Sequence, residues 1–276
     1  MSTKIGTPNA VLWTLGIFLA TNFALLVVVQ MRPHAELDPV VAGAVQAAVF
    51  LTGCSLFAGR RPGRTWSETF ALRRTSLGIV LLALVLGLVV SPPAQALVDW
   101  IERLKPMSTV DKAALEAWFA PRSFAHGVAL YLFAGGVCVF AEELLFRGAL
   151  YTALRPVQSA GSAAWLTAAL FTLTHGEPRF WPSILALAVL LGVVRAVSGS
   201  LWPPLFLHGA FNATALAMPY LPSALNDPGL PVVLGCLPVA LFVLVLIVRI
   251  ARTSASAERA RQVDLEPDPG LGEAQS

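Results

Sequence analysis

The chain has 276 residues, of which 56% are hydrophobic and 13% are charged, and its formal net charge is +3. Soluble domains carry about a quarter charged residues, spread along the sequence so that the surface faces water. Here the charges gather in short segments between long apolar runs, which excludes a soluble globular domain. The small net charge and the absence of a basic stripe also exclude nucleic acid as a partner. The composition predicts an integral membrane protein.

Eight apolar runs have about the length that a membrane-spanning helix needs, which is roughly 20 residues. They predict an all-α fold, a polytopic membrane helix bundle with about eight transmembrane helices. The runs are residues 9–31, 40–57, 77–98, 124–154, 161–175, 182–197, 201–218 and 230–250. No small-residue cleavage site follows the first run, so we expect an uncleaved helix there.

The basic residues predict the orientation, because Lys and Arg in short connections favour the cytoplasmic side. The connection 58–76 contains five arginines and one acidic residue, and the segment after Ile250 begins with further arginines. Both regions are expected in the cytoplasm, so both termini should lie there. The Ala-, Leu- and Arg-rich usage favours a bacterial inner (plasma) membrane.

Three regions follow along the chain. Residues 1–123 should hold the first three spans and, at 99–122, an amphipathic helix on the outer membrane face, although a solvated loop fits the same pattern. Residues 124–250 form the rest of the membrane core, and residues 251–276 lose their apolar side chains, which predicts a disordered cytoplasmic tail. The cysteines lie far apart in apolar runs and predict neither disulfides nor a thiolate zinc site: Cys54, Cys138 and Cys236.

Ionisable side chains gather inside the predicted spans of the second half. Each costs about 2.5 to 3.5 kcal/mol on insertion scales, so such residues are rare and mostly functional. They come from the fourth, fifth and seventh runs: Glu142, Glu143, Arg147, His175, His208 and the polar Asn212. This grouping predicts a polar site inside the membrane.

Helical spacing gives the two glutamates different roles. Residues four apart share a helix face, so Glu143 and Arg147 are expected to form an ion pair. Glu142 is then left unpaired and can act as a general base. His175 can orient a water molecule with Glu142, which predicts hydrolysis of a peptide bond by activated water.

His208 and Asn212 also lie four apart on one face and can donate hydrogen bonds to an oxyanion. Each group alone has a simpler explanation, namely an interfacial salt bridge with a snorkelling Arg147, a histidine in a turn, or hydrogen bonds between helices. Those explanations account less well for all three groups together. His175 must also approach Glu142, so the fifth helix is expected either to tilt strongly or to stop at mid-membrane, with residues 176–182 lining a cavity.

The order Glu-Glu-x-x-x-Arg, Phe-x-x-x-His and His-x-x-x-Asn on successive helices resembles the CAAX protease and bacteriocin-processing (CPBP) family of intramembrane proteases. That family includes the type II CAAX prenyl endopeptidases. The resemblance covers residues 124–218 and implies that 124–250 is a catalytic core. It implies that Glu142 and His175 activate water and that His208 and Asn212 line the oxyanion site. Glu143 and Arg147 would hold the helix in place.

The same Glu and His residues have been proposed as zinc ligands in this family, and such a set can bind zinc. We expect no cofactor and a metal-free, glutamate-dependent peptidase, because H-E-x-x-H is absent and Glu143 is committed to Arg147. Zinc stays an alternative. The absence of G-x-S-x-G argues against a serine nucleophile, for which Ser162 and Ser200 have no further support.

The expected substrate is a protein or peptide with a membrane-embedded or lipidated segment, and membrane lipids are further partners. A prenylated C-terminus, a bacteriocin leader and a C-terminal sorting segment all fit the family. The alternatives are a proton- or ion-coupled transporter, a non-catalytic immunity or scaffold protein, and a lipid-modifying enzyme. The first three spans are too apolar for a transport path, and the intact motifs argue against loss of catalysis.

Overall fold

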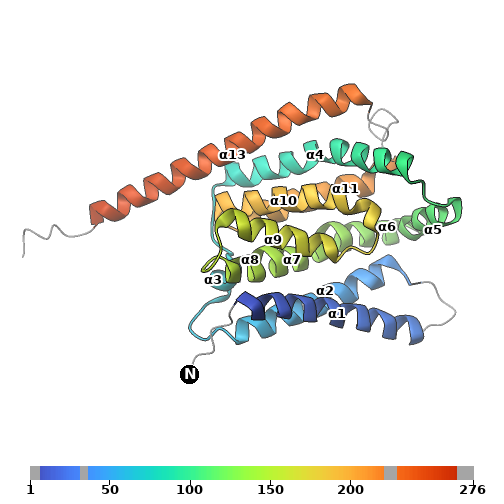
Figure 1. The fold of residues 1–276 in the computed structure, drawn as a ribbon, viewed down its shortest axis with the longest axis horizontal. Helices are drawn as coiled ribbons and strands as arrows, with labels where there is room; N and C mark the ends of the chain where they lie inside the picture. Colours follow the sequence, from blue (N-terminus) through green and yellow to red (C-terminus); the bar gives the residue numbers. More distant parts are fainter. Residues whose placement is uncertain (1–6, 32–36, 221–228, 266–276) are drawn as a thin grey trace, which may run out of the picture.

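A computed structural model describes residues 7–31, 37–220 and 229–265, and the regular elements in these ranges are all helical. The helices lie side by side in one bundle, with α1 and α2 along one edge and α13 along the other (Figure 1). The predicted all-α helix bundle is therefore confirmed. The first half of the bundle consists of α1 (Thr7–Met31), α2 (Pro39–Gly59), α3 (Trp66–Phe70), α4 (Leu77–Leu104) and α5 (Thr109–Phe119).

The second half begins with a helix that two π-helical turns interrupt, here called the interrupted helix (residues 124–154), and it ends with the longest helix, α13. Its elements are α6 (Phe124–Leu132), η1 (Phe133–Val137), α7 (Cys138–Glu143), η2 (Leu144–Leu150), α8 (Tyr151–Leu154), α9 (Ala160–Leu173), η3 (Pro178–Phe180), α10 (Trp181–Ser198), α11 (Trp202–Ala217), η4 (Met218–Tyr220) and α13 (Leu230–Leu265). η1 and η2 are π-helical, while η3 and η4 are 3₁₀ turns.

Six helices in the described ranges are long and apolar enough to cross a membrane. They cover Asn9–Met31, Pro39–Gly59, Leu77–Leu104, Phe124–Leu154, Pro178–Ser198 and Leu230–Ala257. The chain is an integral membrane protein. The predicted count of eight spans is not confirmed, because α9 has 14 residues and α11 has 16, fewer than a full crossing needs.

The first and last helices and the arginine-rich connection meet at one end of the bundle. The start of α1, the arginine-rich connection with α3, and the end of α13 all lie on the left in Figure 1. At this end the Ser200 hydroxyl donates to the Arg73 carbonyl at 2.7 Å, and the Leu201 N–H donates to the Ala71 carbonyl at 2.9 Å. The ends of α1 and α13 that were predicted to share one side of the membrane are therefore on the same end of the fold.

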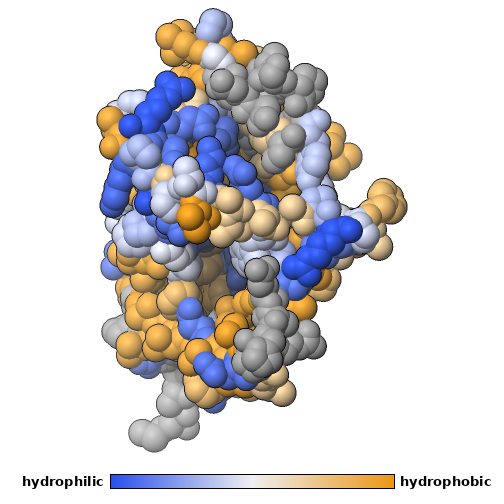
Figure 2. All heavy atoms as spheres, turned by 90° about the vertical axis from the view of Figure 1, so that its right-hand side faces the viewer, coloured by the Kyte–Doolittle hydropathy of each residue, from blue (hydrophilic) through white to orange (hydrophobic). Residues whose placement is uncertain are grey.

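The segment 99–122 divides between two elements. Residues up to Leu104 extend α4, and α5 follows as a separate surface helix with no buried residue. The indole N–H of Trp118 donates to the Leu37 carbonyl at 2.7 Å and ties α5 to the start of α2. Figure 2 looks onto the end of the bundle where α5 lies, on the right in Figure 1. Hydrophilic side chains gather in the upper half of this view, and hydrophobic ones cover the region of α1 and α2 below.

The prediction of a disordered tail at residues 251–276 is wrong for residues 251–265, because α13 continues as a helix to Leu265. Ala, Glu, Arg and Gln in this stretch are good helix formers. A helix already nucleated by the apolar part propagates into such residues at low cost, although the same residues cannot form a packed core. The remainder, 266–276, lies outside the described residues.

A charged cluster anchors the start of α2. Asp38 caps this helix by accepting from the Val40 N–H at 2.8 Å, and its Oδ2 lies 3.0 Å from Arg122 Nη1 and 3.1 Å from His126 Nε2. Burial alone would raise the pKa of Asp38, but the Val40 N–H, His126 and Arg122 together lower it. The ionised carboxylate thus holds the N-terminus of α2 against the start of α6.

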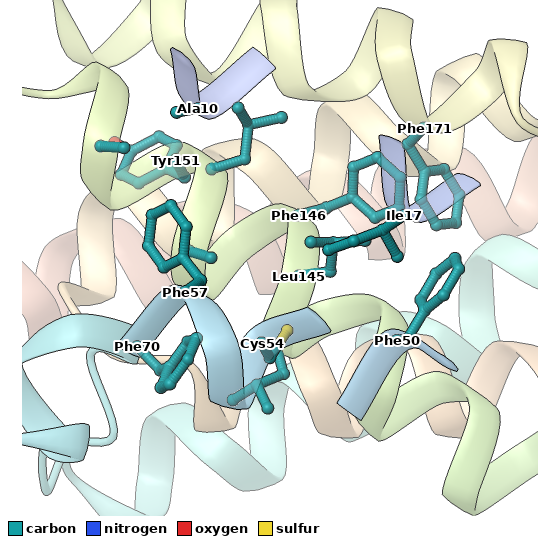
Figure 3. Close-up of a cluster of buried hydrophobic side chains, with 14 of the residues drawn as sticks. Ala10, Ile17, Phe50, Cys54, Phe57, Phe70, Leu145, Phe146, Tyr151 and Phe171 are labelled. Atoms are coloured by element: carbon teal, nitrogen blue, oxygen red, sulfur yellow. The ribbon is translucent and has the colours of Figure 1, made fainter. Parts of the chain in front are cut away.

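The main apolar core joins α1 and α2 to the interrupted helix and α9, and Figure 3 shows Phe50, Phe146 and Phe171 within it. A second cluster joins α4, α10, α11 and α13. α4 and α11 approach closely at Gly87 of α4, where an added Cβ would lie 2.2 Å from the Leu207 carbonyl of α11. Because Gly87 has no side chain, α4 can pack directly against the backbone of α11 next to His208.

Candidate active site

The two glutamates lie in a short α-helical segment between two π-helical turns. α7 ends at Glu143, with η1 before it and η2 directly after it. π-Helical turns widen a helix locally and occur frequently at functional sites. Adjacent residues in α7 point in different directions, so Glu143 is fully buried in the bundle while the Glu142 side chain is 13% exposed.

Glu143 is the centre of a buried charged network. Its Oε1 lies 2.9 Å from Arg147 Nη1 and 3.0 Å from His208 Nδ1. The i, i+4 contact with Arg147 is the one that helical spacing predicts. The contact with His208 is an addition that spacing does not show, since it joins α7 to α11. An ionised carboxylate only accepts hydrogen bonds, so His208 donates from Nδ1.

The sequence predicted that Glu142 has no ion-pair partner, but in the structure this side chain has a hydrogen-bond partner. Its Oε1 accepts a hydrogen bond from Gln46 Nε2 of α2 at 2.6 Å, and its Oε2 lies 3.9 Å from His208 Nε2. The spacing argument considered ion pairs along one helix and expected His175 as the partner from another helix, so it did not anticipate Gln46. His208 therefore lies between the two carboxylates, close to Glu143 and farther from Glu142.

A cavity of about 140 Å³ brings Glu142 and His175 together. It is lined by four segments of the chain, and such a volume holds several water molecules. The lining residues are Phe18, Thr21, Asn22, Leu25, Gln46, Phe50, Glu142, Thr174 and His175. The cavity thus offers a carboxylate, an imidazole and room for water.

His175 lies just beyond α9, which ends at Leu173. Of the two expected alternatives, the stop of the helix is seen, but the cavity is lined here by Thr174 and His175 and not by residues 176–182, which include η3 and the start of α10. His175 Nδ1 lies 2.9 Å from the Phe171 carbonyl, and the His175 carbonyl accepts from the Trp181 indole at 2.7 Å. A carbonyl only accepts, so Nδ1 carries the proton and Nε2 of the neutral ring is an acceptor.

The ring of Phe171 organises the histidines around Arg147. Its centroid lies 4.7 Å from that of His175, 5.7 Å from that of His208, and 4.5 Å from the Arg147 guanidinium carbon. A guanidinium over an aromatic face is attracted by the ring's quadrupole. The Phe of the Phe-x-x-x-His motif therefore supports both the buried charge and the orientation of the two imidazoles.

Side chains from other helices bind carbonyls of both π-helical turns. Asn212 Nδ2 donates to the Ala134 carbonyl in η1 at 3.0 Å, and Arg195 Nε donates to the Arg147 carbonyl in η2 at 3.0 Å. Arg147 Nη2 in turn donates to the Ala188 carbonyl of α10 at 3.1 Å. These contacts fix the two turns that flank α7 and so hold the position of both glutamates.

The predicted oxyanion donors are partly engaged. Neither His208 nor Asn212 is among the residues that line the cavity, and both already donate one hydrogen bond to protein atoms. Asn212 keeps a second N–H on Nδ2. His208 can donate from Nε2 only as an imidazolium, since Nδ1 already donates to Glu143. The predicted water-activating pair, Glu142 and His175, thus lines the cavity, whereas the predicted oxyanion pair does not.

The carboxylates of the site are engaged by protein groups. Within the described ranges, no group of three or more His, Cys, Asp or Glu side chains has a geometry that could hold a metal. Glu143 Oε1 is engaged by Arg147 and His208, and Glu142 Oε1 by Gln46. Zinc prefers four ligands at about 2.0 to 2.3 Å.

Two residues of this site were missed in the sequence. Gln46 is a polar amide in an otherwise apolar run, and Arg195 is a buried cation in another such run. Both carried a usable signal, because polar and charged side chains inside a span are costly. The sequence could not show which residues on other helices these two side chains contact.

Residues 124–214 match the family described as type II CAAX prenyl endopeptidase Rce1-like. The match confirms the resemblance predicted from the three motifs, and it contains all of the predicted site residues. It indicates a protease of the membrane. No curated protein and no solved structure shows significant similarity to the chain.

Proposed function

We propose that this protein is an intramembrane endopeptidase that hydrolyses a peptide bond with a water molecule activated by Glu142 and His175. The observation that carries the proposal is the polar cavity in which these two side chains, from separate segments of the chain, lie together. The family match gives the reaction class, and the cavity supplies a carboxylate, an imidazole acceptor and room for water.

In the proposed reaction Glu142 removes a proton from the water molecule as its oxygen attacks the carbonyl carbon of the scissile bond. His175 accepts a hydrogen bond from the same water through Nε2. The carbonyl oxygen becomes an oxyanion, to which Asn212 donates its second N–H and His208 donates from Nε2 when its ring is protonated to the imidazolium. When the C–N bond breaks, Glu142 returns the proton to the leaving amine. The products are a new carboxyl group and a new amine.

Glu143 and Arg147 have a positioning role in this proposal. Their ion pair is fully buried, and both partners make further contacts, to His208 and to the Ala188 carbonyl. The network thereby connects α7 with α10 and α11. We propose a mechanism without a metal or other cofactor, because the carboxylates are engaged by protein groups.

The proposed substrate is a protein or peptide whose scissile bond lies near the membrane, in a C-terminal or membrane-anchored segment. A lipidated segment agrees with the description of the matched family, whose members are prenyl endopeptidases. Lipids would surround the six apolar helices. The chemistry of the site needs no nucleic acid.

The test is hydrolysis by the purified full-length protein in liposomes. The probe is a quenched fluorescent peptide that ends in a farnesylated CAAX sequence, and membrane fractions analysed by mass spectrometry extend the test to natural proteins. We expect cleavage that places heavy oxygen from labelled water in the new carboxyl group. A metal chelator should leave the rate unchanged. If neither probe is cleaved, the proposed function is wrong, and if zinc restores activity lost to a chelator, the metal-free mechanism is wrong.

We propose further that both termini are cytoplasmic and that the membrane is the bacterial inner membrane. The arginine-rich connection and the end of α13 lie at one end of the bundle, and Lys and Arg favour the cytoplasmic side. A cysteine that replaces the exposed Arg64 should react with an impermeant thiol reagent only after the cytoplasmic face is opened. Labelling of intact cells at this position would reverse the orientation.

A further inference from the structure

Gln46 contacts Glu142 from outside the segment that matches the protease family. Its Nε2 lies 2.6 Å from Glu142 Oε1, and both side chains line the same cavity. An ionised carboxylate repels the carbonyl oxygen of an amide and attracts its N–H, so Gln46 must present its donor to Glu142. A hydrogen bond to a charged group is shorter and stronger than one between neutral groups.

The packing of α2 on the interrupted helix sets this contact. One turn before it, Cys138 Sγ donates to the Gly43 carbonyl at 3.4 Å, and a Cβ on Gly43 would lie 3.0 Å from that sulfur. One turn after it, the rings of Phe50 and Phe146 lie 6.5 Å apart. Close contacts on both sides leave Gln46 little freedom, so its amide is presented to Glu142 by the fold.

We infer that Gln46 is a positioning residue for the proposed base, and this inference rests on the proposed hydrolysis. Its N–H holds Glu142 Oε1 and fixes the rotation of the carboxylate. Oε2 is then left to accept the proton of the attacking water, and the same hydrogen bond stabilises the ionised carboxylate that can accept it. The active site is thereby completed by α2, which belongs to the first 123 residues.

The experiment replaces Gln46 with Met, which has similar length and volume but no donor. The matched control is Gln95→Met, because Gln95 of α4 makes the same kind of contact, from Nε2 to Asp99 Oδ1 at 2.8 Å, away from the site. With the quenched farnesylated peptide we expect Gln46→Met to lower kcat by about 10- to 100-fold, the range for a hydrogen bond to a charged group. KM should stay unchanged, and the melting temperature should match that of the control.

A second variant and a second measurement keep the inference testable if Gln46→Met does not fold. Gln46→Glu keeps the shape but places two carboxylates against each other, so it should lower kcat at least as much. The infrared carboxylate band of Glu142, identified by its loss in Glu142→Gln, should shift in either Gln46 variant and not in Gln95→Met. This readout needs no substrate, and a purely structural role for Gln46 would not move it.

The outcomes separate this inference from the proposed function. If Gln46→Met and Gln46→Glu keep the kcat of the unchanged protein while Glu142→Gln is inactive, the inference is wrong and the proposed hydrolysis stands. An unshifted Glu142 band would also overturn it. If Glu142→Gln is itself fully active, the proposed hydrolysis by Glu142 is wrong, whatever the Gln46 variants do.

Discussion

Glu142→Gln should lower the rate of peptide cleavage by about 100- to 10,000-fold, the contribution of a general base. Glutamine keeps the size of the side chain and can still accept from Gln46 through its carbonyl oxygen, so the contact of α2 with α7 should persist. Its amide cannot take a proton from water at neutral pH. The variant should therefore fold, insert and retain substrate without cleaving it.

The measurements are cleavage of the quenched peptide, retention of a natural precursor in the membrane, and the melting temperature in detergent. Glu116→Gln is the matched control, because Glu116 lies on the exposed surface of α5. It should leave all three values unchanged. Full activity of Glu142→Gln would refute the glutamate mechanism, and a large fall in its melting temperature would show that Glu142 is mainly structural.

Glu143→Gln should instead destabilise the protein, by about 3 to 5 kcal/mol as expected when one partner of a buried ion pair is removed. The Arg147 and Glu143 side chains are both fully buried, so the stranded arginine has no access to bulk water. Loss of the carboxylate also removes the charge that His208 Nδ1 contacts at 3.0 Å. The first effect should be a lower melting temperature and lower abundance in the membrane.

The matched control is Glu177→Gln, which breaks a pair with Arg179 at 3.6 Å whose side chains are 43% and 20% exposed. A partly exposed pair at this distance contributes far less than a fully buried one, so this variant should melt much closer to the unchanged protein than Glu143→Gln does. Replacing Glu143 and Arg147 together with apolar residues of similar volume should recover part of the lost stability. Recovery should be incomplete, because His208 still lacks its partner. A Glu143→Gln protein as stable as the unchanged one would contradict the role of this pair.

The sequence determined the class of the protein and the local geometry of its motifs. The low charge and the long apolar runs define a membrane helix bundle, because hydrocarbon excludes unpaired polar groups wherever they lie along the chain. The Glu143–Arg147 contact was also predictable, since residues four apart on one helix always share a face. The three motifs and their order were enough to identify the family that the comparison then matched.

Only the tertiary structure decided which segments meet. The partner of Glu142 is Gln46, 96 positions earlier in the chain, and the partner of Glu143 on α11 is His208. No periodicity within one helix can show such contacts, because they depend on how close two helices approach and how they are rotated. At Gly43 the missing side chain allows α2 to pack against Cys138, and this approach brings an amide from an apolar span to the proposed catalytic carboxylate.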